Sequence, residues 1–257
     1  MTDSERTFKL VVEYDGSAYH GWQRQGSLPT IQAEIERVIA MMTRKSVHVM
    51  GSGRTDSGVH ALGQVASFRC ATRLSCEALV RGINSLLPGD IVIRDCVEVP
   101  ASFHACHSAI GKTYRYRIHN SPFRQALGRQ YAWHICRPLD IEAMQQALCR
   151  VVGTHDFKGF ESTGSPRVHT VRTIYRADLS QADGCLSVEL TGNGFLRCMV
   201  RNIVGTLVEI GLHRYPETHI ARMLESRDRR QAGTAAPAHG LFLVRVLYET
   251  DMTERPR

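Results

Sequence analysis

The sequence predicts an α+β fold in which one order of elements, β-α-β-β-α-β, occurs twice along 257 residues. Short segments in which apolar residues alternate with polar ones predict strands, and longer segments with apolar residues at helical spacing predict helices. Hydrophobic residues make up 43% of the chain and charged residues 22%. This composition is typical of a soluble globular protein, and the length suffices for one large core or two small ones.

The first half supplies one complete copy of this order. The segment 8–14, F-K-L-V-V-E-Y, is rich in β-branched and aromatic residues and precedes the turn dipeptide Asp15-Gly16, so it predicts a strand. Apolar residues then recur at helical spacing from Ile31 to Met42 and predict a helix. The same criteria predict strands over 46–50 and 64–70, a helix over 75–87 that Pro88-Gly89 ends, and a strand over 91–99.

The second half repeats the order. The segment 112–119, K-T-Y-R-Y-R-I-H, alternates Tyr114, Tyr116 and Ile118 with basic residues, which predicts a strand with two different faces. The remaining predictions are a helix over 140–151, paired strands over 171–178 and 185–191, an amphipathic helix over 196–208, and a last strand over 240–248.

Two copies of this order predict two tandem ferredoxin-like halves, similar to RNA-recognition modules, with a largely antiparallel sheet and a central cleft. We place an N-terminal domain at 1–105 and a C-terminal domain at 106–257, with the boundary within 100–111. We find no clear residue-level repeat between the halves. Modules of this architecture use the open sheet as a platform for RNA, although a fold alone does not determine a function.

The charge of the chain favours a polyanionic partner. Lys and Arg total 32 against 25 acidic residues, which gives a net charge of +7. A solvated basic surface accounts for the same excess, so the charge does not decide between the two. The apolar runs are too short to cross a membrane, and the first residues, M-T-D-S-E-R-T, lack the apolar core of a secretory signal. We therefore expect a cytoplasmic protein without a membrane partner.

The eight cysteines form no C-x-x-C pair and no dense disulfide pattern, so reduced thiols are expected. His104, Cys106 and His107 lie within four residues of one another. So short a segment does not wrap a tetrahedral ion without distant ligands, and we expect no metal site.

The segment 51–60, G-S-G-R-T-D-S-G-V-H, is the strongest candidate for chemistry because three glycines and three hydroxyl residues surround Arg54 and Asp56. Glycine permits tight turns and close backbone approach, so this loop can direct the Asp56 carboxylate toward a substrate. A turn in which Asp56 caps its own backbone has the same composition and remains an alternative.

Two common enzyme loops do not fit this segment. It lacks the G-x-x-x-x-G-K-[ST] pattern of a phosphate-binding loop and precedes a strand instead of a helix. It also lacks the G-x-S-x-G pattern of a serine hydrolase. We therefore expect neither nucleotide hydrolysis nor a nucleotide cofactor.

The run G-R-T-D-S-G-V-H-A-L-G-Q-V at 53–65 resembles the central motif of the TruA-type family of tRNA pseudouridine synthases. Five further segments resemble motifs of that family in the same order along nearly the whole chain. They are Y-D-G-S-A-Y-H-G-W-Q from Tyr14, G-K-T-Y-R-Y-R-I from Gly111, G-T-H-D-F from Gly153, M-V-R-N-I-V-G from Met199 and A-P-A-H-G-L-F-L from Ala236.

The resemblance implies an isomerase that needs no cofactor and converts uridine to pseudouridine at positions 38–40 of the tRNA anticodon stem and loop. It implies that Asp56 is the catalytic carboxylate, attacking either C6 of the uracil or C1′ of the ribose, and that Arg201 is its ion-pair partner. It further implies that Tyr114 stacks on the target base and assists proton removal from C5. Arg54 would follow the flipped nucleotide and hold its gap or its phosphate, and Leu241 would pack against the base from the other face.

The chain departs from the family pattern at two places. Cys106 and His107 stand where an arginine and an aromatic residue are common, and Arg197 and Cys198 stand where aromatic or histidine residues are common. These departures bear on tRNA contacts only. The resemblance also implies a homodimer with tRNA as the partner. A non-catalytic RNA-binding protein and a nucleotide hydrolase are the alternative interpretations.

Overall fold

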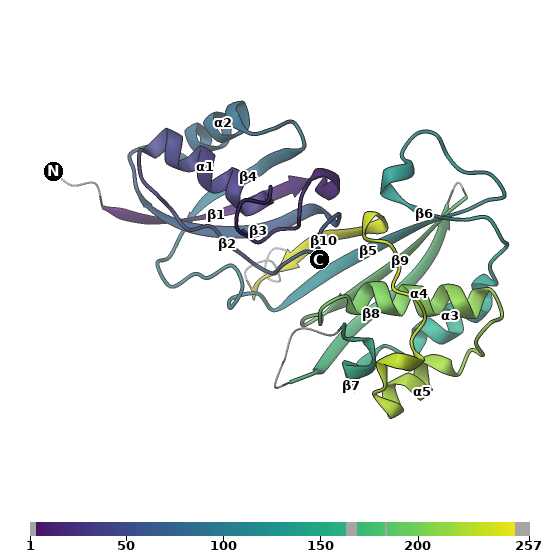
Figure 1. Ribbon diagram of the computed structural model, residues 1–257. Coiled ribbons are helices and arrows are strands. Elements are labelled where there is room, and N and C mark those ends of the chain that lie inside the picture. Colours follow the sequence, from purple (N-terminus) through teal and green to yellow (C-terminus); the bar gives the residue numbers. More distant parts are fainter. Residues whose placement is uncertain (1–3, 163–168, 183, 250–257) are drawn as a thin grey trace, which may run out of the picture. The chain divides into compact units, whose positions relative to one another are not determined.

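The computed structural model describes residues 4–162, 169–182 and 184–249. Contacts divide the chain into two compact units, each of which mixes helices with strands (Figure 1). Unit 1 comprises the described residues of 1–110 and 243–257, and unit 2 comprises those of 111–242. The expected mixture of helices and strands is confirmed.

Unit 1 contains strands in the order β4-β1-β3-β10, and β2 also pairs with β3. β1 pairs antiparallel with both β3 and β4. The elements are β1 (Glu5–Tyr14), α1 (Ile31–Thr43), β2 (Met50–Gly51), β3 (His60–Ala71), α2 (Cys76–Leu86), β4 (Ile91–Val99) and most of β10 (Leu241–Leu247).

The core of unit 1 follows from the alternation along β1. Phe8, Leu10 and Val12 are fully buried on one face of the strand, and Phe8 stacks on Phe68 of β3 with ring centroids 5.1 Å apart.

Both helices of unit 1 begin at a hydroxyl residue that caps them. The Thr30 side chain accepts a hydrogen bond from Ala33 N in α1, and Ser75 accepts one from Ala78 N in α2.

The strand predicted over 46–50 is wrong in extent, because the structure contains only β2 at Met50–Gly51. A buried carboxylate replaces the strand partner for the preceding residue. Val49 N donates to Glu36 Oε1 at 3.0 Å, and His48 Nδ1 lies 3.1 Å from the same oxygen. A backbone donor that a side chain already satisfies does not need a neighbouring strand.

Unit 2 contains strands in the order β5-β9-β8-β7, and β6 also pairs with β5. β9 pairs antiparallel with β5 and β8, and β8 pairs antiparallel with β7. The elements are β5 (Gly111–Asn120), β6 (Trp133–Ile135), α3 (Ile141–Cys149), β7 (Gly153–Asp156), β8 (Val171–Ala182), β9 (Cys185–Gly192), α4 (Met199–Gly211) and α5 (His219–Ser226).

The strand pairing is mixed, which corrects the prediction of a largely antiparallel sheet. β6 was not predicted, and it runs parallel to β5, with Ile118 opposite Trp133 and Asn120 opposite Ile135. A parallel neighbour needs a crossover of about a dozen residues, and the connection 121–132 supplies one. The three residues of β6, W-H-I, are too few to show a strand pattern.

β10 lies mostly in unit 1, although the proposed domain 106–257 includes its residues. No helix in the described part of the chain is long and apolar enough to cross a membrane.

The candidate active-site loop and its surroundings

The loop 51–60 joins β2 to β3 and presents some side chains while burying others. Ser52, Thr55 and His60 are buried, whereas Arg54 is exposed and Asp56 is half-buried. The loop therefore has a buried polar interior, and it presents Arg54 and Asp56, the two residues expected to contact RNA.

Two residues outside the loop hold its interior. Ser52 Oγ donates to Gln64 Oε1 at 2.7 Å, and Gln64 Nε2 donates to Gly53 O at 3.0 Å. Thr55 Oγ1 and the Tyr14 hydroxyl share a hydrogen bond of 2.8 Å. Burial raises the pKa of Tyr14 to about 12, against the opposing effect of its hydrogen bonds, so this hydroxyl stays neutral. A buried and satisfied network of this kind restricts the loop to one conformation.

The segment that follows β1 packs directly against the back of the loop. A Cβ at Gly21 would lie 2.5 Å from Thr55 O, and a Cβ at Gly16 would collide with Val59 O. Gly21 also has a φ of +90°, which favours glycine. Only glycine permits these two approaches, so the segments that resemble the first and second family motifs meet here.

Hydrogen bonds complete this contact. Trp22 N donates to Thr55 O at 3.2 Å, and Ser57 Oγ donates to Tyr19 O at 3.1 Å. Within the loop, Val59 N donates to Asp56 O at 3.2 Å and closes the turn. The backbone is therefore fixed on both sides of Asp56. The supporting residues Tyr14, Gly21 and Gln64 were not predicted as site residues. Gly16 and Gly21 were a usable signal, because glycine often marks a close backbone approach.

Three other predicted site residues lie in unit 2. Tyr114 is 8% exposed on β5, and its ring meets Phe195 edge to face with centroids 5.0 Å apart. Leu241 is 6% exposed at the start of β10. Arg201 is half-buried in the first turn of α4. The packing of Tyr114 also fits a structural role, as is usual for an aromatic residue on a strand.

Arg201 is hydrogen-bonded to Ala236, in the segment that leads to Leu241. Its Nε donates to Ala236 O at 2.7 Å, and Ala236 N donates to Arg201 O at 3.0 Å. The Tyr116 hydroxyl donates to Pro237 O at 2.7 Å in the same segment. Burial raises the pKa of Tyr116, and the charge of Arg201 opposes this, so the two side chains are within electrostatic reach. Unit 2 thus brings Arg201 next to the 236–241 segment.

Three of the four residues that depart from the family pattern are exposed, and Cys198 is half-buried. Cys106 and His107 are exposed, and their backbone N–H groups donate to His104 Nδ1 at 3.1 and 3.2 Å. Arg197 is exposed, and Cys198 has a φ of 58° immediately before α4. None of these four residues belongs to the interior of the Asp56 loop.

Comparisons with known proteins match this chain to one family. A family model described as tRNA pseudouridine synthase matches residues 10–107 and 147–249. A tRNA pseudouridine synthase A of Acetivibrio thermocellus is 46% identical over 95% of this chain and 100% of the relative. Proteins of the same name from Thermoanaerobacter sp. and Exiguobacterium sp. are 43% and 44% identical over 95% of this chain, and over 100% and 98% of their own lengths.

Among solved structures, one from the archaeal box H/ACA sRNP Nop10-Cbf5 complex is 12% identical, with a TM-score of 0.37 over 78% of this chain and 43% of that chain. We draw no conclusion from a similarity of that size. The family model covers most of the chain, and the relatives cover nearly all of it, including the Asp56 loop. This chain belongs to the tRNA pseudouridine synthase family.

Proposed function

We propose that this chain is a tRNA pseudouridine synthase that isomerises uridine at positions 38–40 of the anticodon stem and loop. The observation that carries the proposal is the family match across 10–107 and 147–249, which includes the loop that presents Asp56. The rigid backbone of this loop supports the assignment, since a nucleophile must be held in a productive geometry.

The reaction is an isomerisation, so uridine and pseudouridine have the same atomic composition. The enzyme first turns the base out of its stack, which costs a few kcal/mol. The Asp56 carboxylate attacks either C6 of the uracil or C1′ of the ribose, and the N1–C1′ bond breaks. The detached base rotates, and a C5–C1′ bond forms. The C5 proton then leaves, N1 gains a proton, and the carboxylate is released.

The other residues have supporting roles in this proposal. Arg201 keeps Asp56 ionised, because a neighbouring guanidinium favours the charged form of a carboxylate. Tyr114 stacks on the target base and assists the loss of the C5 proton, while Leu241 packs against the base. Arg54 suits the space left by the flipped nucleotide because it is exposed and its planar fork matches phosphate geometry.

The finer architecture is part of the same proposal. The order β-α-β-β-α-β in unit 1 and the antiparallel β5-β9-β8 arrangement in unit 2 support a ferredoxin-like interpretation of each half. We further propose a division into domains at 1–105 and 106–257, a homodimeric assembly and a cytoplasmic location.

The decisive experiment incubates the protein with unmodified tRNA transcripts and maps new pseudouridines by chemistry specific to them. We expect modification confined to positions 38–40. Modification elsewhere in the tRNA would contradict the proposed site. Tight tRNA binding without modification of any transcript would favour a non-catalytic RNA-binding protein.

A further inference from the structure

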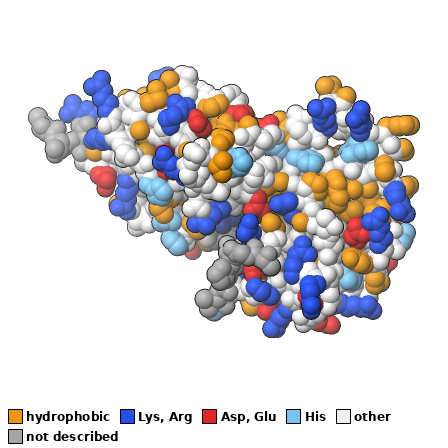
Figure 2. Space-filling view, viewed as in Figure 1, with side chains coloured by type: hydrophobic (Ala, Val, Ile, Leu, Met, Phe, Trp, Pro, Cys, Tyr) orange, Lys and Arg blue, Asp and Glu red, His pale blue; other side chains and the backbone are white. Residues whose placement is uncertain are grey.

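Unit 2 contains a second candidate site, which the proposed reaction does not use. A cavity of about 430 Å³ is lined by three histidines and two arginines, which are His119, His134, His239, Arg124 and Arg129. They come from β5, from the connection 121–132 with its short helix η2 (Arg129–Tyr131), from β6, and from the short helix η5 (Ala238–Gly240). Figure 2 shows basic and histidine side chains gathered beside hydrophobic ones over this connection.

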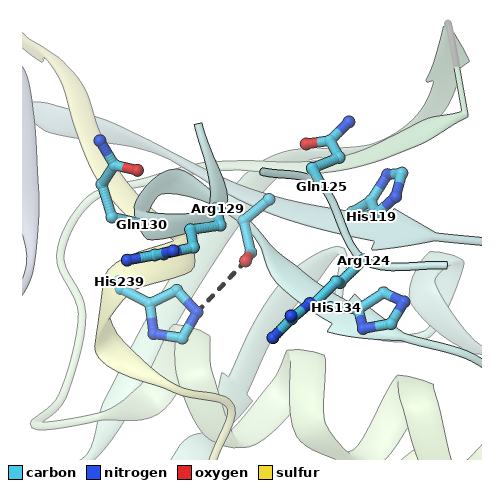
Figure 3. Close-up of a pocket in the computed structure, with 8 residues that line it drawn as sticks. His119, Arg124, Gln125, Arg129, Gln130, His134 and His239 are labelled. Atoms are coloured by element: carbon cyan, nitrogen blue, oxygen red, sulfur yellow. Dashed lines mark hydrogen bonds between the residues drawn. The ribbon is translucent and has the colours of Figure 1, made fainter. Parts of the chain in front are cut away.

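The histidines hold the connection in place. His119 Nε2 lies 3.1 Å from Phe123 O and His134 Nε2 lies 2.8 Å from Ser121 O. His239 Nε2 lies 3.2 Å from Ala132 O, as the dashed line in Figure 3 marks. A carbonyl oxygen only accepts, so each Nε2 carries a hydrogen and donates it. These three bonds tie the connection 121–132 to β5, β6 and η5.

The arginines supply the charge. Arg124 and Arg129 are exposed residues of the same connection, and both side chains extend into the opening near His239 (Figure 3). Among the described residues, neither forms an ion pair. The lining residues that the structure describes include no Asp or Glu. Two guanidinium groups over one opening without a counter-charge favour an anion, and their donor geometry matches phosphate.

A neighbouring aromatic residue indicates which phosphate compound fits. Phe123 lies one residue before Arg124 and is 81% exposed. Proteins commonly hold single-stranded RNA by stacking a base on an exposed aromatic ring while neighbouring cations hold a phosphate. Free phosphate would not use the ring.

We propose that Arg124 and Arg129 bind a backbone phosphate of the tRNA substrate in this cavity, with an adjacent base on Phe123. This inference rests on the proposed function for the identity of the RNA. The cavity is a positioning site: it contributes to tRNA affinity and leaves the chemical step to the Asp56 loop.

The test compares tRNA binding by the double variant Arg124→Gln/Arg129→Gln with the wild type from about 50 to 200 mM salt. The matched control is Arg150→Gln/Arg222→Gln, which removes two arginines outside the cavity. We expect the cavity variant to bind tRNA about tenfold more weakly near 100 mM salt, with a salt slope smaller by about one. The control should keep the wild-type slope. An unchanged affinity and slope in the cavity variant would overturn the proposal.

Three further measurements sharpen the result. Arg124→Lys/Arg129→Lys should keep the wild-type slope while losing part of the affinity, because charge is retained and the planar fork is removed. At saturating tRNA, the Gln variant should form pseudouridine at the wild-type kcat with a raised KM.

Titration with inorganic phosphate distinguishes free phosphate from RNA as the ligand. If the Gln variant loses phosphate binding but binds tRNA as the wild type does, RNA is not the ligand. A wild type that binds tRNA without forming pseudouridine would sink the proposed function and leave this binding test valid.

Discussion

Asp56 is held by a backbone that is fixed on both sides, so its substitution should affect chemistry and little else. Asp56→Asn keeps the shape of the side chain and removes the nucleophile. We expect pseudouridine formation to fall by at least about 10⁴-fold, while tRNA affinity and the unfolding temperature stay near those of the wild type. Single-turnover kinetics with saturating enzyme measure this directly. A loss of only a few-fold would indicate a positioning role for the carboxylate.

Gly21 lies in the segment that follows β1 and packs directly against the backbone of the Asp56 loop. In Gly21→Ala, the new Cβ would lie 2.5 Å from Thr55 O at a φ of +90°. We expect a loss of about 2 to 4 kcal/mol in the free energy of unfolding, together with reduced activity. Gly26→Ala is the matched control, because Gly26 has a φ of +51° but nothing within 4 Å of the new Cβ. It should cost about 1 kcal/mol and leave activity unchanged, as denaturant unfolding and a tRNA assay will show. Equal effects in the two variants would contradict packing against the loop.

The free energy of unfolding should depend on pH through the buried Tyr14 hydroxyl. Burial raises its pKa from 10.0 to about 12, so the folded state holds the proton more tightly than the unfolded state does. The resulting stabilisation is fully present below pH 10 and disappears as the pH rises through about 12. It amounts to about 2 to 3 kcal/mol. Tyr14→Phe removes the titrating hydroxyl, so its unfolding free energy should decline less between pH 10 and 12 than that of the wild type. Parallel declines would show that Tyr14 does not titrate in this range.

Among the secondary-structure elements, α4 matters because its first turn connects Arg201 to the segment before β10. Arg201→Ala removes the 2.7 Å bond to Ala236 O and the proposed partner of Asp56. We expect pseudouridine formation to fall about 100-fold and stability to fall by about 1 kcal/mol. Arg201→Lys should restore the charge but only part of the activity, since lysine lacks the planar fork. Full activity of the alanine variant would exclude the ion pair.

How well each element was predicted depends on how local its cause is. β1 and α1 follow from alternation and helical spacing within their own residues, and the sequence predicted both. The strand predicted over 46–50 is cut short because a distant carboxylate, Glu36, accepts from Val49 N, and β6 depends on a crossover that returns to β5. No pattern within these segments reveals such partners.

The site shows the same division. Asp56 stands out because glycines and hydroxyl residues surround it in the sequence. Tyr14 and Gln64, which hold its loop, have ordinary strand neighbours and became visible only once β1 and β3 paired. The supporting roles of such residues depend on contacts between elements, which composition and spacing within one segment do not reveal.

For the whole chain, the net charge of +7 determines how tRNA should be held. Lys and Arg neutralise phosphates and release counterions, so binding weakens log-linearly with salt. If about 5 to 8 phosphates are neutralised, the slope should lie between about −3.5 and −7, depending on how much of the bound RNA is single-stranded. Filter binding across a salt series measures it. A slope near zero would mean that non-ionic interactions dominate affinity.

Arg197 allows this account to be tested at one position. It is exposed just before α4, and we infer that it binds the RNA backbone in place of the arginine that the family pattern commonly has where this chain has Cys106. Arg197→Ala should weaken binding of all tRNAs about equally and reduce the salt slope by about one, because a phosphate contact carries no sequence information. The choice of uridine should remain unchanged, as pseudouridine mapping will show. Unchanged affinity and slope would mean that Arg197 does not bind the RNA backbone and does not compensate for the absence of an arginine at Cys106.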